Sequence, residues 1–362
     1  MRPLSGIVTG EPGEVASLCS VQLFYNSFPF DVGEQAVTTE KPEQPRRKIE
    51  SMTTQRQPGN EFAFIDWLRQ RTRSSSRVLI GPGDDTASLA WPGDTPCLVT
   101  TDMLLDGSCF ILREAGAHRV GRKAMAVNLS DIAAMAGRPV AAVVSVGLPR
   151  KDGRKLAEEL YLGLRDVADA FDTTIIGGDT NSWDGPLAIS VTLLGEATPP
   201  GPVRRNGARP GDWLMSTGCF GGSIRGKHLD FTPRIREALA LQSLVRLHAM
   251  IDVSDGLAAD VWHICEESGC GAVLRGDAIP IDPAAIAMDD GKSPLEHALG
   301  DGEDFELVFA VDAADGKLLL DKQPLPDTRI ARLGEIVESE LWLEENGVLR
   351  PLPPSGYVHT LE

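Results

Sequence analysis

The sequence predicts two α/β domains whose sheets are partly antiparallel. The chain has 362 residues, which at about 100–200 residues per domain is enough for two domains. Strand patterns follow one another directly in some places and are separated by helical patterns in others, a mixture typical of mixed sheets. Thr198-Pro-Pro-Gly-Pro202 is the best candidate for the linker between the halves.

The order of the expected elements follows from these patterns. Residues 1–59 are rich in Pro, Glu, Gln and Thr, so we expect a disordered extension, and Asn60 is the expected N-cap of a helix over 61–68. In the first half we expect strands over 97–101, 140–146, 173–176 and 187–194 and helices over 120–135 and 154–170. In the second half we expect strands over 212–216, 250–253 and 305–311 and helices over 233–248 and 256–267. The predicted domains are 60–198 and 203–345, followed by a C-terminal tail, 346–362.

Composition excludes several classes of function. The formal net charge is -17, which argues against nucleic acid or an anionic membrane as the main partner because both require a basic face. No apolar run of about 18 residues is present, so no membrane span is expected. The six cysteines form no CxxC pair, and scattered thiols fit a cytoplasmic protein.

An acidic pattern recurs along the chain, in which a short apolar segment ends in small residues and then an aspartate. It occurs as Thr100-Thr-Asp102, Asn128-Leu-Ser-Asp131, Gly177-Gly-Asp179 and Asp252-Val-Ser-Asp255, and Gly83-Asp-Asp85 and Gly302-Glu-Asp304 resemble it. Acids at strand ends meet at one edge of a sheet. Several carboxylates in one cleft cannot all stay ionised without cations, and Mg²⁺ prefers such ligands together with phosphate oxygens. The pattern therefore favours a Mg²⁺–phosphate site.

Each of these segments also has a simpler interpretation. Gly83-Asp-Asp85 alone is typical of a turn, and Asp252-Val-Ser-Asp255 could only cap the next helix. The glycines at 218, 221 and 222 could mark an ordinary loop, and Arg205 could be a surface residue. The sequence contains no GxxxxGK[ST] loop and no GxGxxG after a strand, so a phosphate site would be of another type.

Seven ordered motifs together carry a specific resemblance. They are Gly-x-Gly-Asp-Asp, Thr-Thr-Asp-Met-Leu, Ala-Val-Asn-Leu-Ser-Asp-Ile-Ala-Ala-Met, Gly-Gly-Asp-Thr, Gly-Ala-Arg-Pro-Gly-Asp, Ile-Asp-Val-Ser-Asp-Gly-Leu and Gly-Glu-Asp-Phe-Glu-Leu. From Glu61 to Tyr357 the chain resembles the thiamine-monophosphate kinase family, in the superfamily of aminoimidazole ribonucleotide synthetase and selenophosphate synthetase.

The resemblance implies a fold and a reaction. The N-terminal mixed-sheet domain would pair with its twin in a homodimer to form a shared β-barrel, beside a C-terminal α/β sandwich. The implied reaction transfers a phosphoryl group from ATP to thiamine monophosphate with Mg²⁺, giving thiamine diphosphate. Because the attacking phosphate oxygen is already anionic, no general base is expected, and catalysis would consist of positioning and charge neutralisation.

The resemblance also implies roles for individual residues. The implied Mg²⁺ ligands are Asp85, Thr100, Thr101, Asp102, Asp131, Asp179, Asp252 and Asp255. The implied nucleotide contacts are Gly178, Asp179, Arg205 and Ser254. The implied contacts to thiamine monophosphate are Cys109, Glu303 and Tyr357.

One departure from the family pattern concerns the substrate side. In Asp106-Gly-Ser-Cys-Phe110, Cys109 stands where the family usually has a histidine that touches substrate, and a thiol is a poor hydrogen-bond donor. Substrate binding could therefore be rearranged, or the preferred substrate could differ. The alternatives are a non-catalytic nucleotide-binding homologue and a superfamily synthetase acting on another substrate.

Overall fold

The described residues of the computed structural model are 78–80, 84–91 and 95–358. All of them belong to one compact unit, Ser51–Glu362. The predicted extension, 1–59, and the predicted helix over 61–68 lie outside the described residues.

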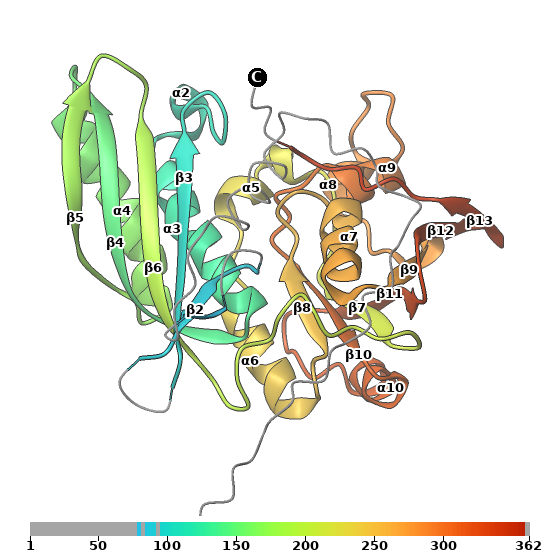
Figure 1. Ribbon diagram of the computed structural model, residues 1–362. Helices are drawn as coiled ribbons and strands as arrows, with labels where there is room; N and C mark the ends of the chain where they lie inside the picture. The colour runs from blue at the N-terminus through green and yellow to red at the C-terminus, as the bar shows by residue number, and fades with distance from the viewer. Residues whose placement is uncertain (1–77, 81–83, 92–94, 359–362) are drawn as a thin grey trace, which may run out of the picture. The chain divides into compact units, whose positions relative to one another are not determined.

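The first half forms a six-stranded mixed sheet with strand order β1-β2-β3-β6-β4-β5 (Figure 1). Its strands are β1 (Val78–Ile80), β2 (Ala87–Leu89), β3 (Cys97–Leu105), β4 (Gly137–Pro149), β5 (Thr174–Trp183) and β6 (Ala188–Ala197). Only β4 and β5 run parallel, joined by a helix, and the other neighbours are antiparallel. Over the described residues the sheet is open, with β1 and β5 at its edges, so it does not close into a barrel within one chain.

Two long helices, α3 (Ala117–Ala134) and α4 (Gly153–Ala170), cover one face of this sheet, after the short α2 (Leu112–Ala115) (Figure 1). Glycines let the two long helices touch backbone to backbone. A Cβ at Gly121 would lie 2.1 Å from the carbonyl oxygen of Leu160, and one at Gly163 would lie 1.9 Å from that of His118. Any larger residue would force α3 and α4 apart.

The second half forms a seven-stranded sheet with order β13-β12-β9-β11-β7-β10-β8. Its strands are β7 (Trp213–Thr217), β8 (Ala249–Asp252), β9 (Gly271–Arg275), β10 (Leu307–Val311), β11 (Ile330–Val337), β12 (Leu341–Glu345) and β13 (Val348–Pro351). Its helices are α5 (Lys227–Asp230), α6 (Ile235–Leu244), α7 (Leu257–Ser268), α8 (Pro283–Ile286), α9 (Pro294–Gly300) and α10 (Ala313–Lys322), with the 3₁₀ turns η1 (Ser223–Arg225) and η2 (Gly276–Ala278). Only β9 and β12 run parallel, so the prediction of two partly antiparallel α/β sheets is confirmed.

Several elements differ from the sequence prediction. Strand β5 continues past the expected end at 176, and β9, β11 and β12 were not expected. The helix expected over 233–248 ends at Leu244, because the following residues extend toward the sheet, where the backbone N–H of His248 donates to the carbonyl of Ala310 at 2.8 Å. In the segment predicted as a tail, 346–362, β13 adds an edge strand to the second sheet.

Helix α3 connects the two sheets. It packs on β3 and β6 of the first sheet and also contacts α5, α6 and β8 of the second half. A single buried apolar cluster accordingly contains Leu129 of α3 and Phe309 of β10. The two predicted domains therefore share part of their core. Among the described helices, none is both long and apolar enough to cross a membrane.

Candidate active site

Three aspartates from distant parts of the sequence come together beside α3. The carboxylate oxygens of Asp85, Asp131 and Asp252 lie within 4.8 Å of one another. Asp85 lies in the turn before β2, Asp131 in α3 and Asp252 at the end of β8. The cluster thus forms where the first sheet, its helix and the second sheet meet.

The strand-end interpretation of the acidic pattern is correct for Asp252 and wrong for three other acids. Asp131 lies inside α3, where the helix, and not a strand end, brings it to the cluster. Asp102 and Asp179 lie within β3 and β5, both of which continue past the acid.

The charged forms of Asp131 and Asp252 are disfavoured by burial and by neighbouring carboxylates, and that of Asp102 by burial. Burial raises the pKa of Asp252 to about 8, with the charge of Asp85 as the next cause. Burial also raises the pKa of Asp131 well above its ordinary value, and the neighbouring carboxylates add to this effect. Burial alone raises the pKa of Asp102 to about 6.

The donor set fits a hard divalent cation. All the clustered ligands are carboxylate oxygens, the type that Mg²⁺ prefers. One oxygen of Asp102, Oδ2, is buried without a hydrogen-bond partner, which costs free energy unless something binds it. A bound cation would satisfy this oxygen and offset the repulsion between the neighbouring carboxylates.

Two hydroxyl groups orient the carboxylates. The Thr100 hydroxyl donates to Oδ2 of Asp131 at 2.5 Å, and the Ser130 hydroxyl donates to Oδ2 of Asp252 at 2.5 Å. Thr100 therefore lies beside the cluster as a hydrogen-bond donor to one of its acids. Ser130 was not among the predicted site residues, although it stands next to Asp131 in the Asn-Leu-Ser-Asp motif.

Arg205 lies against the acidic cluster in a bidentate ion pair. Its Nε and NH2 atoms each donate to a carboxylate oxygen of Asp85 at 2.9 Å. Burial would lower the pKa of Arg205, but the charge and hydrogen bonds of Asp85 outweigh burial and leave the pKa raised. The backbone N–H of Arg205 donates to Asp84 at 2.8 Å. Arg205 is thus a fixed cation at the site and not a free surface residue.

Three of the predicted residues are not brought to the cluster by their side chains. The Thr101 hydroxyl lies on the other face of β3 from Thr100, where it donates to the carbonyl of Val191 at 3.0 Å. Gly178 and Asp179 are exposed on the edge strand β5, which β4 and β6 separate from β3. Within one chain, these residues are away from Asp131.

The loop after β8 holds Ser254 and Asp255. The carbonyl of Ser254 accepts the backbone N–H of Glu303 at 2.7 Å. Asp260 of α7, not Asp255, accepts the backbone N–H groups of Asp255 and Gly256, both at 3.1 Å. Burial raises the pKa of Asp260 well above its ordinary value. The side chain of Asp260 therefore fixes the start of α7 from within the helix.

The predicted substrate residues border this loop and α3. The ammonium of Lys123 donates to the carbonyl of Cys109 at 2.7 Å and to Oε1 of Glu303 at 2.5 Å. The backbone N–H of Tyr357 donates to the carbonyl of Asp255 at 2.9 Å, and its side chain is exposed. Lys123 was not predicted from the sequence, because a lysine in a helix is usually solvated.

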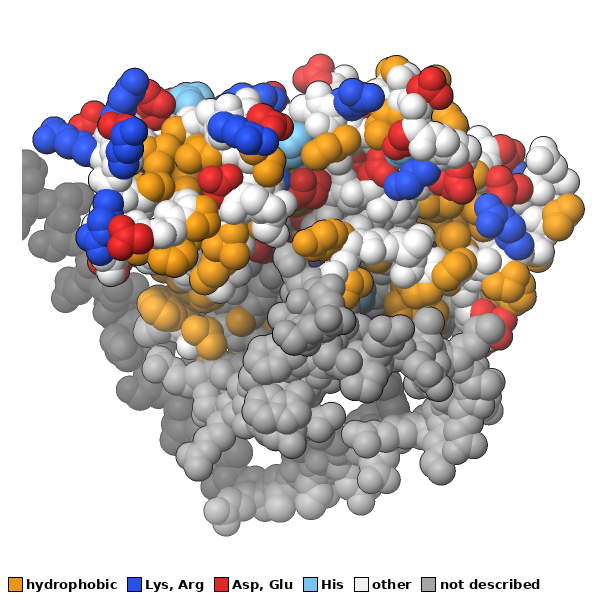
Figure 2. Space-filling model, turned by 90° about the horizontal axis from the view of Figure 1, so that it is seen from above, with side chains coloured by type: hydrophobic (Ala, Val, Ile, Leu, Met, Phe, Trp, Pro, Cys, Tyr) orange, Lys and Arg blue, Asp and Glu red, His pale blue; other side chains and the backbone are white. Residues whose placement is uncertain are grey.

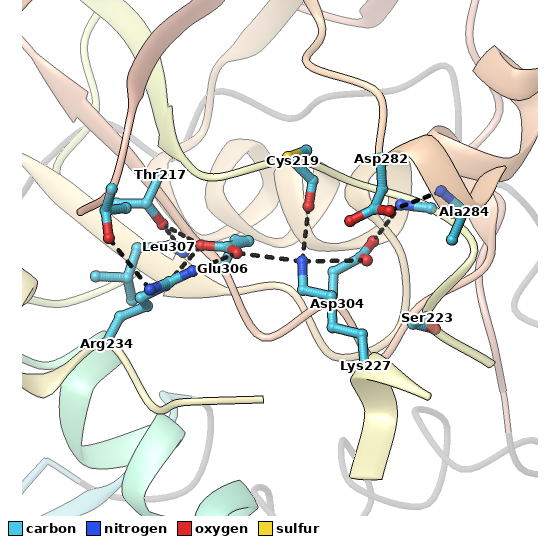
Figure 3. A network of polar contacts seen from close by, with 12 residues as sticks. Thr217, Cys219, Ser223, Lys227, Arg234, Asp282, Ala284, Asp304, Glu306 and Leu307 are labelled. Atoms are coloured by element: carbon cyan, nitrogen blue, oxygen red, sulfur yellow. Dashed lines mark hydrogen bonds and ion pairs between the residues drawn. The ribbon is translucent and has the colours of Figure 1, made fainter. Parts of the chain in front are cut away.

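A separate polar network supports the Gly-rich loop after β7 (Figure 3). Lys227 donates to the carbonyl of Cys219 at 2.7 Å and lies 3.1 Å from Oε1 of Glu306, which also receives Arg234 at 2.7 Å. Burial would raise the pKa of Glu306, but Arg234 and then Lys227 lower it. This network does not share its acids with the aspartate cluster.

Asp304 occupies the other end of that network. Its Oδ2 accepts the backbone N–H of Gly221 at 2.9 Å, and its Oδ1 lies 3.6 Å from Lys227 (Figure 3). Burial raises the pKa of Asp304 to about 7 in spite of the opposing charge of Lys227. The glycines at 218, 221 and 222 therefore belong to a loop that buried acids hold in place.

Comparison with known families assigns both halves of the chain. Residues 83–197 match the AIR synthase related protein N-terminal domain, and residues 205–341 match the C-terminal domain of the same family. The thiamine-monophosphate kinase of Rhodopirellula baltica is 40% identical over 310 residues, which cover 83% of this chain and 97% of that protein. The enzyme of the same name from Salmonella typhimurium is 37% identical over 330 residues, covering 83% and 98%.

Solved structures agree with these matches. AaThiL complexed with AMPPCP and TMP superposes with a TM-score of 0.72 at 28% identity, covering 83% of this chain and 97% of that one. Thiamine-monophosphate kinase from Stenotrophomonas maltophilia has a TM-score of 0.64 at 32% identity, covering 80% and 98%. The chain therefore belongs to the thiamine-monophosphate kinase family of AIR synthase related proteins.

Proposed function

We propose that this protein transfers the γ-phosphoryl group of ATP to thiamine monophosphate, giving ADP and thiamine diphosphate. The observation that carries the proposal is the cluster of Asp85, Asp131 and Asp252, whose oxygens lie within 4.8 Å of one another. The named relatives match almost over their full length, and one neighbour was solved with AMPPCP and TMP. Such a site serves phosphoryl transfer because that reaction depends on positioning and on charge neutralisation.

We propose that the cluster holds Mg²⁺. The side-chain ligands would be Asp85, Asp131 and Asp252, with Thr100 orienting Asp131. Asp102, whose charge acts on Asp131, would be a further ligand. Asp255 lies in a second group of possible ligands, with Asp260 and His263. Bound Mg²⁺ would neutralise charge on the phosphates of both substrates. Thr101 could contribute only through its backbone carbonyl or after rearrangement, since its hydroxyl is bonded on the other face of β3.

Apart from metal binding, the reaction needs only residues that position the two substrates. The nucleophile is a phosphate oxygen of thiamine monophosphate, which is anionic near neutral pH, so no side chain has to remove a proton. Arg205 is fixed at the cluster by Asp85, where its guanidinium can face a nucleotide phosphate. Ser254 follows Asp252 in the same loop and would contact the nucleotide. Cys109, Glu303 and Tyr357 would contact the thiamine moiety.

A homodimer would complete this site. Among the described strands, β2 pairs only with Cys97–Val99 of β3, so residues 100–105 extend beyond that pairing, and β5 is an exposed edge strand. Pairing β5 of one copy with this free part of β3 of another would close the two sheets into a barrel. It would also bring Gly178 and Asp179 of one copy close to Asp102 of the other, as their predicted roles at the nucleotide and the metal require.

A product assay tests the proposal. The protein is incubated with ATP and Mg²⁺ and with either thiamine monophosphate or free thiamine. We expect thiamine diphosphate from the monophosphate only. ATP binding without turnover would support a non-catalytic homologue. If ATP is consumed only when an acceptor other than these two compounds is added, the protein would be a superfamily enzyme with a different substrate.

A further inference from the structure

Lys123 is a charged residue that the chain buries almost completely. Its side chain is 1% exposed, although it belongs to α3, whose outer residues could reach solvent. Burying an ammonium group is costly unless hydrogen bonds and an opposite charge replace its water. The contacts of this ammonium should therefore show why the chain places a lysine here.

The ammonium joins two segments that are far apart in the sequence. It donates to the backbone carbonyl of Cys109, at 2.7 Å, and to Oε1 of Glu303, at 2.5 Å. Cys109 follows β3 of the first sheet, whereas Glu303 precedes β10 of the second. Lys123 thus fixes the distance between the segments that hold Cys109 and Glu303, both of which the proposed function assigns to the thiamine side of the site.

Glu303 needs such a support. Its φ is 53°, in the left-handed region that a residue with a side chain occupies only at a cost. Its backbone N–H is held by the carbonyl of Ser254 at 2.7 Å. The backbone contact fixes where the residue lies, and Lys123 fixes where its carboxylate points. The side chain of Glu303 is still 35% exposed, so a ligand can reach it.

We propose that Lys123 is a positioning residue for thiamine monophosphate, acting through Glu303 and the backbone of Cys109. This inference rests on the proposed function and adds a residue to its substrate side. Thiamine offers a cationic thiazolium and an aminopyrimidine with N–H donors, both complementary to a carboxylate held in a fixed direction. Because Lys123 bonds none of the clustered aspartates in the described contacts, its loss should affect thiamine monophosphate and spare ATP.

The test compares Lys123→Met with Lys123→Arg, Glu303→Gln and the double variant Lys123→Met/Glu303→Gln. Methionine keeps the length of the aliphatic stem and removes the charge. Lys155→Met is the matched control, because it removes a lysine of α4 that is 82% exposed. KM and kcat are measured for each substrate, and binding of thiamine monophosphate is measured separately by calorimetry without ATP.

We expect Lys123→Met to raise KM and Kd for thiamine monophosphate by about 10- to 100-fold, the range of one charge-assisted hydrogen bond. KM for ATP should stay within about 2-fold of its wild-type value. The double variant should be no worse than the more impaired of its two parent variants, because both substitutions remove one unit. Lys123→Arg should lie between wild type and Lys123→Met, and Lys155→Met should match wild type.

Three outcomes would overturn the inference. They are an unchanged affinity of Lys123→Met for thiamine monophosphate, an equal loss of affinity for both substrates, and additive losses of affinity for thiamine monophosphate in the double variant. If Lys123→Met does not fold, Lys123→Arg is used instead, and the test again compares the change in KM for thiamine monophosphate with the change in KM for ATP. A wild-type protein that does not phosphorylate thiamine monophosphate would instead refute the proposed function. Calorimetry measures binding without turnover, so it tests the role of Lys123 independently of that outcome.

Discussion

Asp131 shows how a single residue combines two opposing demands. It lies in α3 among carboxylates that raise its pKa, while the Thr100 hydroxyl donates to it and favours the charged form. The net result is a raised pKa, because burial and the neighbouring carboxylates outweigh this hydrogen bond. With the proposed Mg²⁺, the same crowded carboxylates would act as ligands, so an arrangement that costs stability in the free protein would contribute to binding.

Replacing Asp131 separates these effects. Asp131→Asn removes one charge but keeps the shape and an oxygen that can accept from Thr100. We expect kcat for phosphoryl transfer to fall by at least about 100-fold, because a charged ligand at the reacting phosphates is lost. The unfolding free energy of the metal-free protein should stay constant or rise, since repulsion decreases.

Steady-state kinetics and denaturant unfolding measure the two quantities. Asp169→Asn is the control, because that aspartate lies on α4 with 70% of its side chain exposed. Near-full activity of Asp131→Asn would show that the metal assignment at this position is wrong.

Cys109 gives the second prediction at this scale. Its carbonyl is held by Lys123, and its thiol lies 4.0 Å from the carbonyl of Met103, a weak contact. Cys109→His would add an imidazole donor on the substrate side without changing the backbone contact. We expect KM for thiamine monophosphate to fall by about 2- to 10-fold, the range of one neutral hydrogen bond. Cys109→Ser is the control for size, and identical KM values in all three proteins would place residue 109 outside the substrate contacts.

Sequence motifs predicted the residues with unusual chemistry better than the residues that support them. Asp85, Asp131 and Asp252 were predicted as one site and lie together in the structure. Lys123 and Ser130 were missed, because their partners are distant in the sequence and nothing local distinguishes them from ordinary helix residues. A supporting residue is defined by tertiary contacts, which a local pattern does not contain.

At the scale of elements, the strand-end reason for grouping the acids is only partly right. The fold class, the long helices α3 and α4 and strands such as β3 and β6 follow from local periodicity, which depends on which face is buried. The strand-end rule, however, does not describe Asp131 or Asp179, which lie inside α3 and β5. Alternation along β5 could not reveal its length, since the strand is exposed along nearly all of it.

The Gly-rich loop after β7 allows a prediction about pH. Asp304 has a pKa of about 7 in the folded protein, mainly because of burial, against an ordinary 3.8 when unfolded. Between these values the folded state keeps a proton that the unfolded state has released, so the unfolding free energy falls as the pH rises through this window. Asp304→Asn should remove this loss, which is at most about 4 kcal/mol.

Denaturant unfolding of both proteins from pH 4 to pH 8 measures the difference. We expect Asp304→Asn to gain stability relative to wild type as the pH rises, with most of the gain complete near pH 7. Asp289→Asn, at an exposed position, is the control. A difference that does not change with pH would show that Lys227 already compensates the buried charge fully.

At the scale of the whole molecule, the outer face of the first sheet requires an explanation. Hydrophobic side chains gather at the left of Figure 2, the side on which this sheet lies in Figure 1. The exposed apolar residues of its strands include Met103, Leu105, Val143, Ile176 and Trp183. Exposed apolar residues concentrated on one sheet indicate an interface, which agrees with the proposed homodimer.

Ile176→Arg tests this interface. Ile176 is 60% exposed on β5, so in a monomer the substitution should have little effect on stability. In the proposed dimer it would bury an unpaired charge, so we expect sedimentation velocity to show monomers and activity to fall by at least about 10-fold. Tyr161→Arg on α4, where the tyrosine is 47% exposed, is the control. A wild-type protein that is already monomeric and active would refute the proposed dimer.

The response of the whole molecule to Mg²⁺ should depend on pH. The folded pKa of Asp252 is about 8, because of burial and the charge of Asp85, so the metal-free fold keeps a proton that the unfolded chain releases near pH 4. The unfolding free energy of the metal-free protein therefore falls as the pH rises toward 8. Mg²⁺ competes with this proton, and binding to the folded state alone raises the unfolding free energy.

Thermal unfolding with EDTA or with MgCl₂, at pH 6 and at pH 8, tests this competition. We expect Mg²⁺ to raise Tm by a few degrees, about 2–8 °C, at pH 8 and by less at pH 6, where protons still occupy the cluster. Asp131→Asn should reduce the rise at pH 8, because one ligand is lost, while Asp169→Asn should not. An equal rise in Tm at both pH values would mean that Mg²⁺ binds elsewhere. Mg²⁺ binding depends on pH in this range only if the cation displaces protons from its site.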